Sequence, residues 1–94
     1  MEETIKRIEY FEEILNCSEE AVKKLLEAVD EYREILPKIK ELDEYYQSDL
    51  WQKDLEKDED GLLPNDLKRG VLSEDGIYDL LQDADEIEGL LNLK

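Results

Sequence analysis

A heptad repeat of apolar residues runs through the first half of this chain and limits what it can fold into. With Ile8 at the first position a, ten of the twelve a and d positions up to residue 46 are apolar or aromatic. The twelve are Ile8, Phe11, Leu15, Ser18, Val22, Leu25, Val29, Tyr32, Leu36, Ile39, Asp43 and Tyr46. A 3.5-residue spacing kept over about five heptads is typical of a long helix that packs against other helices.

Two residues could interrupt this helix. Ser18, followed by two glutamates, has the pattern of a helix N-cap, and Pro37 lacks the N–H that a helix interior uses. The apolar register continues through both positions, and five more apolar residues widen the stripe on its flanks. These are Ile5, Ile14, Leu26, Ile35 and Leu42. We therefore predict one helix over residues 3–46, bent at Pro37, and a break at Ser18 or Pro37 is the alternative.

The predicted length of this helix conflicts with a compact fold. Residues 3–46 would span about 66 Å at about 1.5 Å per residue. A compact chain of this length has a diameter of only about 32 Å, from its expected radius of gyration. Either the chain turns sharply at Pro37, or the protein is elongated, or a second copy covers the stripe. The last of these leads us to expect a homodimer.

The second half of the chain predicts two further helices. Ser48 is the expected N-cap of a short helix over residues 49–58, which is followed by a loop, "DEDGLLPND". Apolar residues at helical spacing predict another helix from Ser73 to about Leu93. No segment alternates like a strand. The predicted fold is a single all-α domain over residues 1–94, in which a long kinked helix packs against a short helix and a C-terminal helix. A three-helix antiparallel bundle and an elongated hairpin both fit.

The stretch between the last two helices, "LPNDLKRGVLSEDGIYDLL", predicts a succession of turns. Asn65 is the expected cap of a single helical turn over residues 66–69, and Gly70 is expected to end it in the left-handed conformation. We expect Val71 and Leu72 to enter the core and Ser73 to cap the last helix.

These turns do not account for two features of the stretch. Gly76 would lie inside a helix, which costs about 1 kcal/mol relative to alanine, and a close helix crossing would explain it. Lys68 and Arg69 form the only basic pair in the second half of the chain. For Arg69 we expect an internal contact with a carboxylate of a neighbouring helix, and a ligand site is the alternative.

The charge of the chain limits its partners. It has 28 acidic and 12 basic residues, for a formal net charge of −16. Nucleic acids and anionic lipid surfaces are bound through lysine and arginine, so the sequence predicts neither nucleic-acid nor membrane binding. The negative net charge is compatible with a basic protein partner or with a bound cation. No signal-peptide or membrane-spanning run occurs, which favours a cytoplasmic location.

The residues needed for common catalytic sites are missing. The chain has no histidine, and its single cysteine, Cys17, cannot form an internal disulfide. Neither a glycine-rich phosphate loop nor a serine nucleophile motif occurs. We therefore predict no catalytic residues and no cofactor.

An acidic segment resembles part of a calcium-binding loop. Glu56, Asp58 and Asp60 occupy the first, third and fifth places of an EF-hand pattern, and Gly61 occupies the sixth. The twelfth place, which should hold a bidentate glutamate, is Leu67. These acids are therefore weak metal candidates, and a solvated acidic turn is the simpler interpretation.

Aromatic and charged clusters are the candidate interaction sites. Tyr45, Tyr46 and Trp51 gather where the long helix ends, and they could anchor a bound peptide or close a corner of the core. The segment from Glu74 to Glu88 holds seven acids and no base, so it forms either a solvated face or an anionic docking surface. Lys68 and Arg69 complete the set of candidates.

Three segments together resemble a known family. They are "RIEYFEEIL", "PKIKELDEYYQSDLW" and "GLLPNDLKRGVLSEDGIYDLL", and the family is a small bacterial one catalogued as domain of unknown function 4298. The similarity spans nearly the whole chain, and residues 63–81 are its most specific part. The resemblance implies a short, soluble, intracellular, all-helical protein, and it brings no activity, ligand or catalytic residue.

The function that fits these features is a non-catalytic protein–protein interaction module that self-associates or docks a basic partner. The alternative is a divalent-metal-dependent enzyme or cation-binding protein that uses the acids of residues 54–60.

Overall fold

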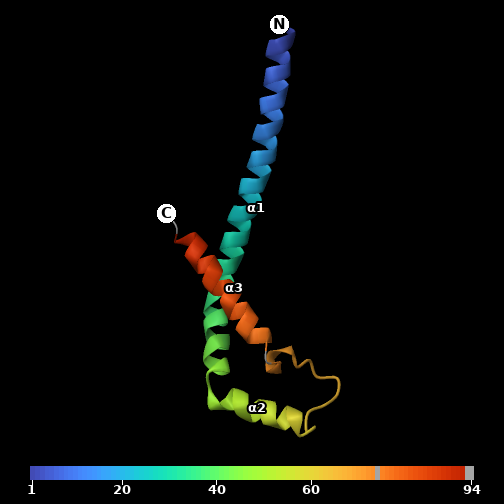
Figure 1. Cartoon of the computed structure of the whole chain (residues 1–94), viewed down its shortest axis with the longest axis vertical. Helices are drawn as coiled ribbons and strands as arrows, with labels where there is room; N and C mark the ends of the chain where they lie inside the picture. The colour runs from blue at the N-terminus through green and yellow to red at the C-terminus, as the bar shows by residue number, and fades with distance from the viewer. Residues whose placement is uncertain (74, 93–94) are drawn as a thin grey trace. The chain divides into compact units, whose positions relative to one another are not determined.

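Helices are the regular elements of this protein (Figure 1). The computed structural model describes residues 1–73 and 75–92. Within these ranges the chain forms no strand, which confirms the predicted all-α fold. Its elements are the helices α1 (Glu2–Tyr46), α2 (Asp49–Glu59) and α3 (Gly76–Leu91) and a short 3-10 turn, η1 (Gly70–Leu72).

The chain divides into two compact units, residues 1–36 (unit 1) and residues 37–94 (unit 2). Unit 1 consists of most of α1. Unit 2 contains the end of α1, then α2, η1 and α3. The expected single domain stays a prediction, and we describe each unit by itself. No helix within the described ranges has the length and hydropathy needed to cross a membrane.

The long first helix is confirmed. α1 runs without a break through Ser18 and through Pro37, as its unbroken apolar register predicts. The expected bend at Pro37 stays a prediction. No residue of α1 is buried.

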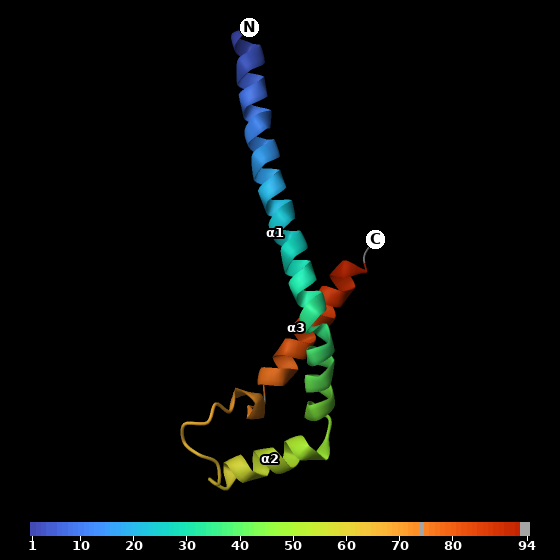
Figure 2. The ribbon, with the colours of Figure 1, turned by 180° about the vertical axis from the view of Figure 1, so that it is seen from behind.

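The core of unit 2 is small and centres on Trp51. Trp51, Leu72 and Ile77 are buried together, which brings α2, η1 and α3 into one cluster. Partly buried side chains from the end of α1, from α2, from the loop and from α3 pack around them: Leu42, Tyr45, Tyr46, Leu55, Leu63 and Leu81. Figures 1 and 2 show that the chain between α2 and η1 runs as an open loop.

The start of α2 differs in detail from the expected cap. Ser48 is the N-cap residue, as predicted, but its hydroxyl makes no capping hydrogen bond to α2. The hydroxyl instead donates to the carbonyl oxygen of Tyr45, at 2.6 Å, in the last turn of α1, and the same oxygen also accepts the N–H of Ser48. Ser48 therefore closes the end of one helix rather than the start of the next.

The glycine that ends a helix in the left-handed conformation is Gly61, with φ 73°, and not Gly70. The N–H of Leu62 donates to the Lys57 carbonyl, and the N–H of Gly61 donates to the Asp58 carbonyl. These two bonds form a Schellman motif, which closes the C-terminus of α2.

The predicted helical turn over residues 66–69 is wrong. Its place is taken by a turn in which the N–H of Leu67 donates to the Pro64 carbonyl, and the 3-10 turn follows at Gly70–Leu72. Since no helix ends at Gly70, the left-handed conformation expected there is not needed.

The prediction for the two residues after Gly70 is half right. Leu72 is buried, as expected, whereas Val71 is 39% exposed. In a 3-10 turn neighbouring residues point in directions about a third of a turn apart, so only one of the two can face the core.

Ser73 is not the N-cap of the last helix as predicted, since α3 begins at Gly76 and its N-cap residue is Asp75. Ser73 nevertheless binds the first N–H of the helix. Its hydroxyl accepts the N–H of Gly76 at 3.1 Å and donates to the Gly70 carbonyl at 2.8 Å. The predicted end of this helix, near Leu93, lies outside the described residues, and α3 ends at Leu91.

These two bonds also explain why residue 76 is a glycine. A Cβ at this position would lie 2.6 Å from the Ser73 Oγ and 2.8 Å from the Gly70 carbonyl oxygen. The close approach is to the preceding turn, so the helix crossing expected at Gly76 is not its cause.

We predict that Gly76→Ala destabilises the protein by about 1–3 kcal/mol, because the added methyl group must displace a backbone carbonyl. Gly89→Ala is the matched control in the same helix. Apart from the adjacent residues and the backbone of the helix itself, no described atom lies within 4 Å of a Cβ there, so the gain in helix propensity should stabilise the protein by up to about 0.5–1 kcal/mol. Urea unfolding followed by Trp51 fluorescence measures both, and equal stability of the two variants would contradict this explanation of Gly76.

Candidate functional site

An exposed apolar stripe follows α1 through unit 1. Eight large apolar side chains on this face are between 43% and 65% exposed. We call this set the α1 stripe: Ile5, Ile8, Phe11, Ile14, Leu15, Val22, Leu25 and Leu26. No other element of unit 1 covers them, because unit 1 consists of this single helix.

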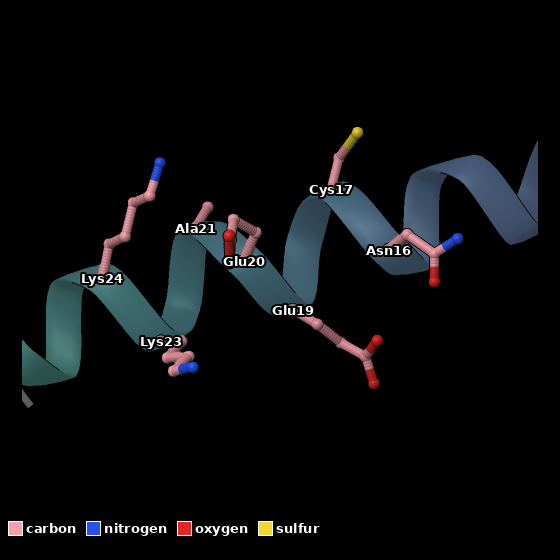
Figure 3. Close-up of a pocket in the computed structure, with 7 residues that line it drawn as sticks. All are labelled: Asn16, Cys17, Glu19, Glu20, Ala21, Lys23 and Lys24. Atoms are coloured by element: carbon pink, nitrogen blue, oxygen red, sulfur yellow. The ribbon is translucent and has the colours of Figure 1, made fainter.

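A shallow hollow beside the stripe does not form a binding site. It is lined by seven residues of α1, from Asn16 to Lys24, and these side chains point to different sides of one helix (Figure 3). Without a second element there is no opposing wall that could enclose a ligand. Cys17 lies on this surface as a free, exposed thiol.

Unit 2 holds a more enclosed pocket, of about 310 Å³. Residues from the end of α1, from α2, from the loop and from η1 line it. We call it the basic pocket, because three of its nine lining residues are cationic: Tyr45, Asp54, Lys57, Leu63, Leu67, Lys68, Arg69, Val71 and Leu72.

One side of the basic pocket is held by a hydrogen bond between α1 and α2. The Tyr45 hydroxyl donates to the Asp54 Oδ2 at 2.6 Å. Burial raises the pKa of Tyr45 to about 12, and the hydrogen bond to Asp54 and its negative charge act in the same direction. Tyr45 is therefore a neutral donor at ordinary pH, and one oxygen of the Asp54 carboxylate is occupied.

A second contact at the basic pocket is the ion pair that the sequence predicted for Arg69. Its Nη1 lies 2.7 Å from the Oδ1 of Asp58 in α2, which confirms an internal contact with a neighbouring helix. The pair joins the loop to α2 and leaves Lys68, the other half of the basic pair, exposed on the pocket lining.

The other aromatic candidates lie in the core rather than on a free surface. Trp51 is only 6% exposed, and its indole N–H donates to the Val71 carbonyl oxygen at 3.0 Å. Tyr46 packs edge to face against it, with ring centroids 5.0 Å apart. Trp51 and Tyr46 therefore close the corner where α1 meets α2.

The acids of residues 54–60 do not gather into a group of three or more ligands. Within residues 1–73 and 75–92, no group of three or more histidine, cysteine or acidic side chains could hold one. Of the three weak candidates, Asp58 is engaged by Arg69, while Glu56 and Asp60 are exposed on α2 and just after it.

Sequence reasoning missed Lys57 as part of a site, and it considered Asp54 only among the acids of residues 54–60 as a possible metal ligand. Nothing in their local sequence sets them apart from the other charged residues of α2. Only the return of the loop and η1 past α2 brings them together with Lys68 and Val71.

We predict that the free energy of unfolding falls as pH rises from about 10 to about 12. Below pH 10 the Tyr45 phenol is neutral in both the folded and the unfolded protein. Above pH 10 this phenol ionises first in the unfolded protein, because its pKa in the folded protein is about 12. In Tyr45→Phe this decline should be shallower. Urea unfolding at several pH values measures it, with Tyr10→Phe, which removes an exposed phenol, as the control. Equal slopes in Tyr45→Phe and Tyr10→Phe would contradict the assignment.

The comparison with known proteins places the chain in a family. The family described as "Domain of unknown function (DUF4298)" matches residues 8–92, and the chain belongs to it. No curated protein and no solved structure matches the chain.

Proposed function

We propose that this member of the DUF4298 family is a non-catalytic interaction module that self-associates through the α1 stripe. The observation that carries the proposal is the exposure of all eight side chains of the stripe along one face of α1. Contiguous apolar surfaces of this kind mark interaction sites, because removing them from water is favourable by about 25 cal/mol per Å².

The heptad spacing makes a second copy of the same helix a suitable partner. Two helices that share the repeat can interlock their a and d side chains without any further adaptation. A long amphipathic helix also gains most of its stability from packing of its apolar face, so pairing would stabilise α1 itself.

The charges beside the stripe favour a parallel pair. In the heptad frame Arg7 lies at position g and Glu12 at the following e, so in a parallel pair each Arg7 faces Glu12 of the second copy. In the antiparallel register that overlaps residues 8–25, Glu12 would instead face Glu19 of the second copy, and like charges repel.

The core positions point to the same arrangement. Over residues 8–25, Leu15 at a and Phe11 and Ser18 at d are exceptions, but Ile8 and Val22 are β-branched residues at position a and Leu25 occupies position d. This combination favours two-stranded parallel coiled coils.

The alternative of a divalent-metal-dependent enzyme has no comparable support. It depends on the acids of residues 54–60. Within the described part of the chain Asp54 accepts the Tyr45 hydroxyl and Asp58 pairs with Arg69.

We predict that Phe11→Ser weakens self-association at least about tenfold, because each dimer would lose two buried phenyl groups. Tyr10→Ser is the matched control. Tyr10 is 63% exposed and Phe11 57%, but Tyr10 lies at position c, outside the stripe. Sedimentation equilibrium over about a hundredfold range of concentration measures the dissociation constants, since the dimer fraction follows mass action.

A wild-type chain that stays monomeric over this range would contradict the proposal, as would an equal loss in Tyr10→Ser. Trp51 fluorescence provides a check that both variants keep the core of unit 2 intact.

The parallel orientation has its own test. We predict that Leu25→Cys, made together with Cys17→Ser, forms an intermolecular disulfide on mild oxidation, because equivalent d positions face each other in a parallel pair. In the antiparallel register Leu25 faces Ile8 of the second copy, and the two introduced thiols would be about 25 Å apart. A dimer by sedimentation that gives no disulfide on non-reducing gels would contradict the parallel orientation but not self-association.

A further inference from the structure

The basic pocket gathers positive charge in a chain of net charge −16. Three of the twelve basic residues line it, with Asp54 as the only acid among the nine lining residues. One oxygen of that carboxylate is already occupied by Tyr45. Bases gathered on one small surface of an acidic chain create a local field that attracts anions.

Two of the three cations have no ion-pair partner within residues 1–73 and 75–92. Arg69 is paired with Asp58. Within the described residues, neither Lys57 nor Lys68 has an ion-pair partner within 4.0 Å, although the chain has 28 acids. Among the described residues, these two ammonium groups are therefore open to an added anion.

The rest of the lining is apolar. Leu63, Leu67, Val71 and Leu72 contribute hydrocarbon, and Tyr45 contributes its ring. Ligand pockets combine such a lining with a few polar groups that fix orientation, and their volumes are about 300–1,000 Å³. At about 310 Å³ the basic pocket lies at the small end of this range. It has room for about ten groups the size of a water molecule.

We propose that the basic pocket binds a small amphipathic carboxylate, whose hydrocarbon lies against the leucines and whose carboxylate is held by Lys57 and Lys68. An inorganic anion would leave the apolar lining unused, and a neutral hydrocarbon would leave the two lysines without a partner. The site lies in unit 2, so it is independent of self-association through the α1 stripe.

Trp51 supplies the reporter for a test with octanoate. It is the only tryptophan, and its indole donates to the carbonyl of Val71, which lines the pocket. We expect octanoate to change Trp51 fluorescence saturably, with a dissociation constant below about 1 mM. Acetate, which has the carboxylate without the chain, and octan-1-ol, which has the chain without the charge, should each bind much more weakly.

The double variant Lys57→Gln/Lys68→Gln should bind octanoate about tenfold more weakly, as the loss of two ion pairs implies. The double variant Lys40→Gln/Lys53→Gln is the control, because it makes the same change in net charge at residues outside the pocket. Its affinity should match that of the wild type.

Four results would overturn the proposal: no saturable change with octanoate, equal binding of octan-1-ol, equal binding of acetate, or an equal loss of affinity in the two double variants. Chemical-shift mapping of the backbone amides checks the location, which should centre on residues 54–72 and leave residues 1–36 unchanged.

Discussion

The burial of the Trp51 side chain is the interaction on which unit 2 depends. Its indole ring contacts Leu72 and Ile77, and its N–H is satisfied by the Val71 carbonyl. A buried indole contributes a large apolar area, and a hydrogen bond removes the cost of burying its polar group. One side chain thus holds α2, η1 and α3 together, and the basic pocket exists because η1 is held at this position. The Tyr45–Asp54 and Arg69–Asp58 contacts then attach the end of α1 and the loop to α2 at the pocket.

Few of the acidic side chains form ion pairs. The described residues contain two, and one of them, between Lys38 and Glu41, lies on the exposed surface of α1, where such a pair contributes little. The other, between Arg69 and Asp58, joins the loop to α2. Most of the carboxylates instead remain in water, where they keep the protein from precipitating and add mutual repulsion to the folded state. The free energy gained by burying the small core of unit 2 must exceed the cost of that repulsion.

How far the sequence predicts the fold depends on how local each signal is. The extent of α1 follows from its heptad repeat, which continues through Ser18 and Pro37. The turns after α2 were predicted less well, because Gly61 and Gly70 both follow plausible helix ends and only the hydrogen bonds of Leu62 and Gly61 show which one is used. The contact of Arg69 with α2 could be anticipated from the scarcity of bases in the second half of the chain. The basic pocket could not, since its lining comes from four segments that meet only through the core around Trp51.

The division into a core-forming unit and a bare amphipathic helix has a thermodynamic consequence. Unit 2 stabilises itself by burying Trp51, Leu72 and Ile77, so its folding free energy belongs to the single chain. Residues 5–26 of unit 1 have no buried side chain, and under the proposed pairing their helix gains stability by mass action. No single free energy would then describe the whole protein, because two-state unfolding requires that all parts melt together. Dilution would act on the first third of the chain as a denaturant does, and it would leave the rest folded.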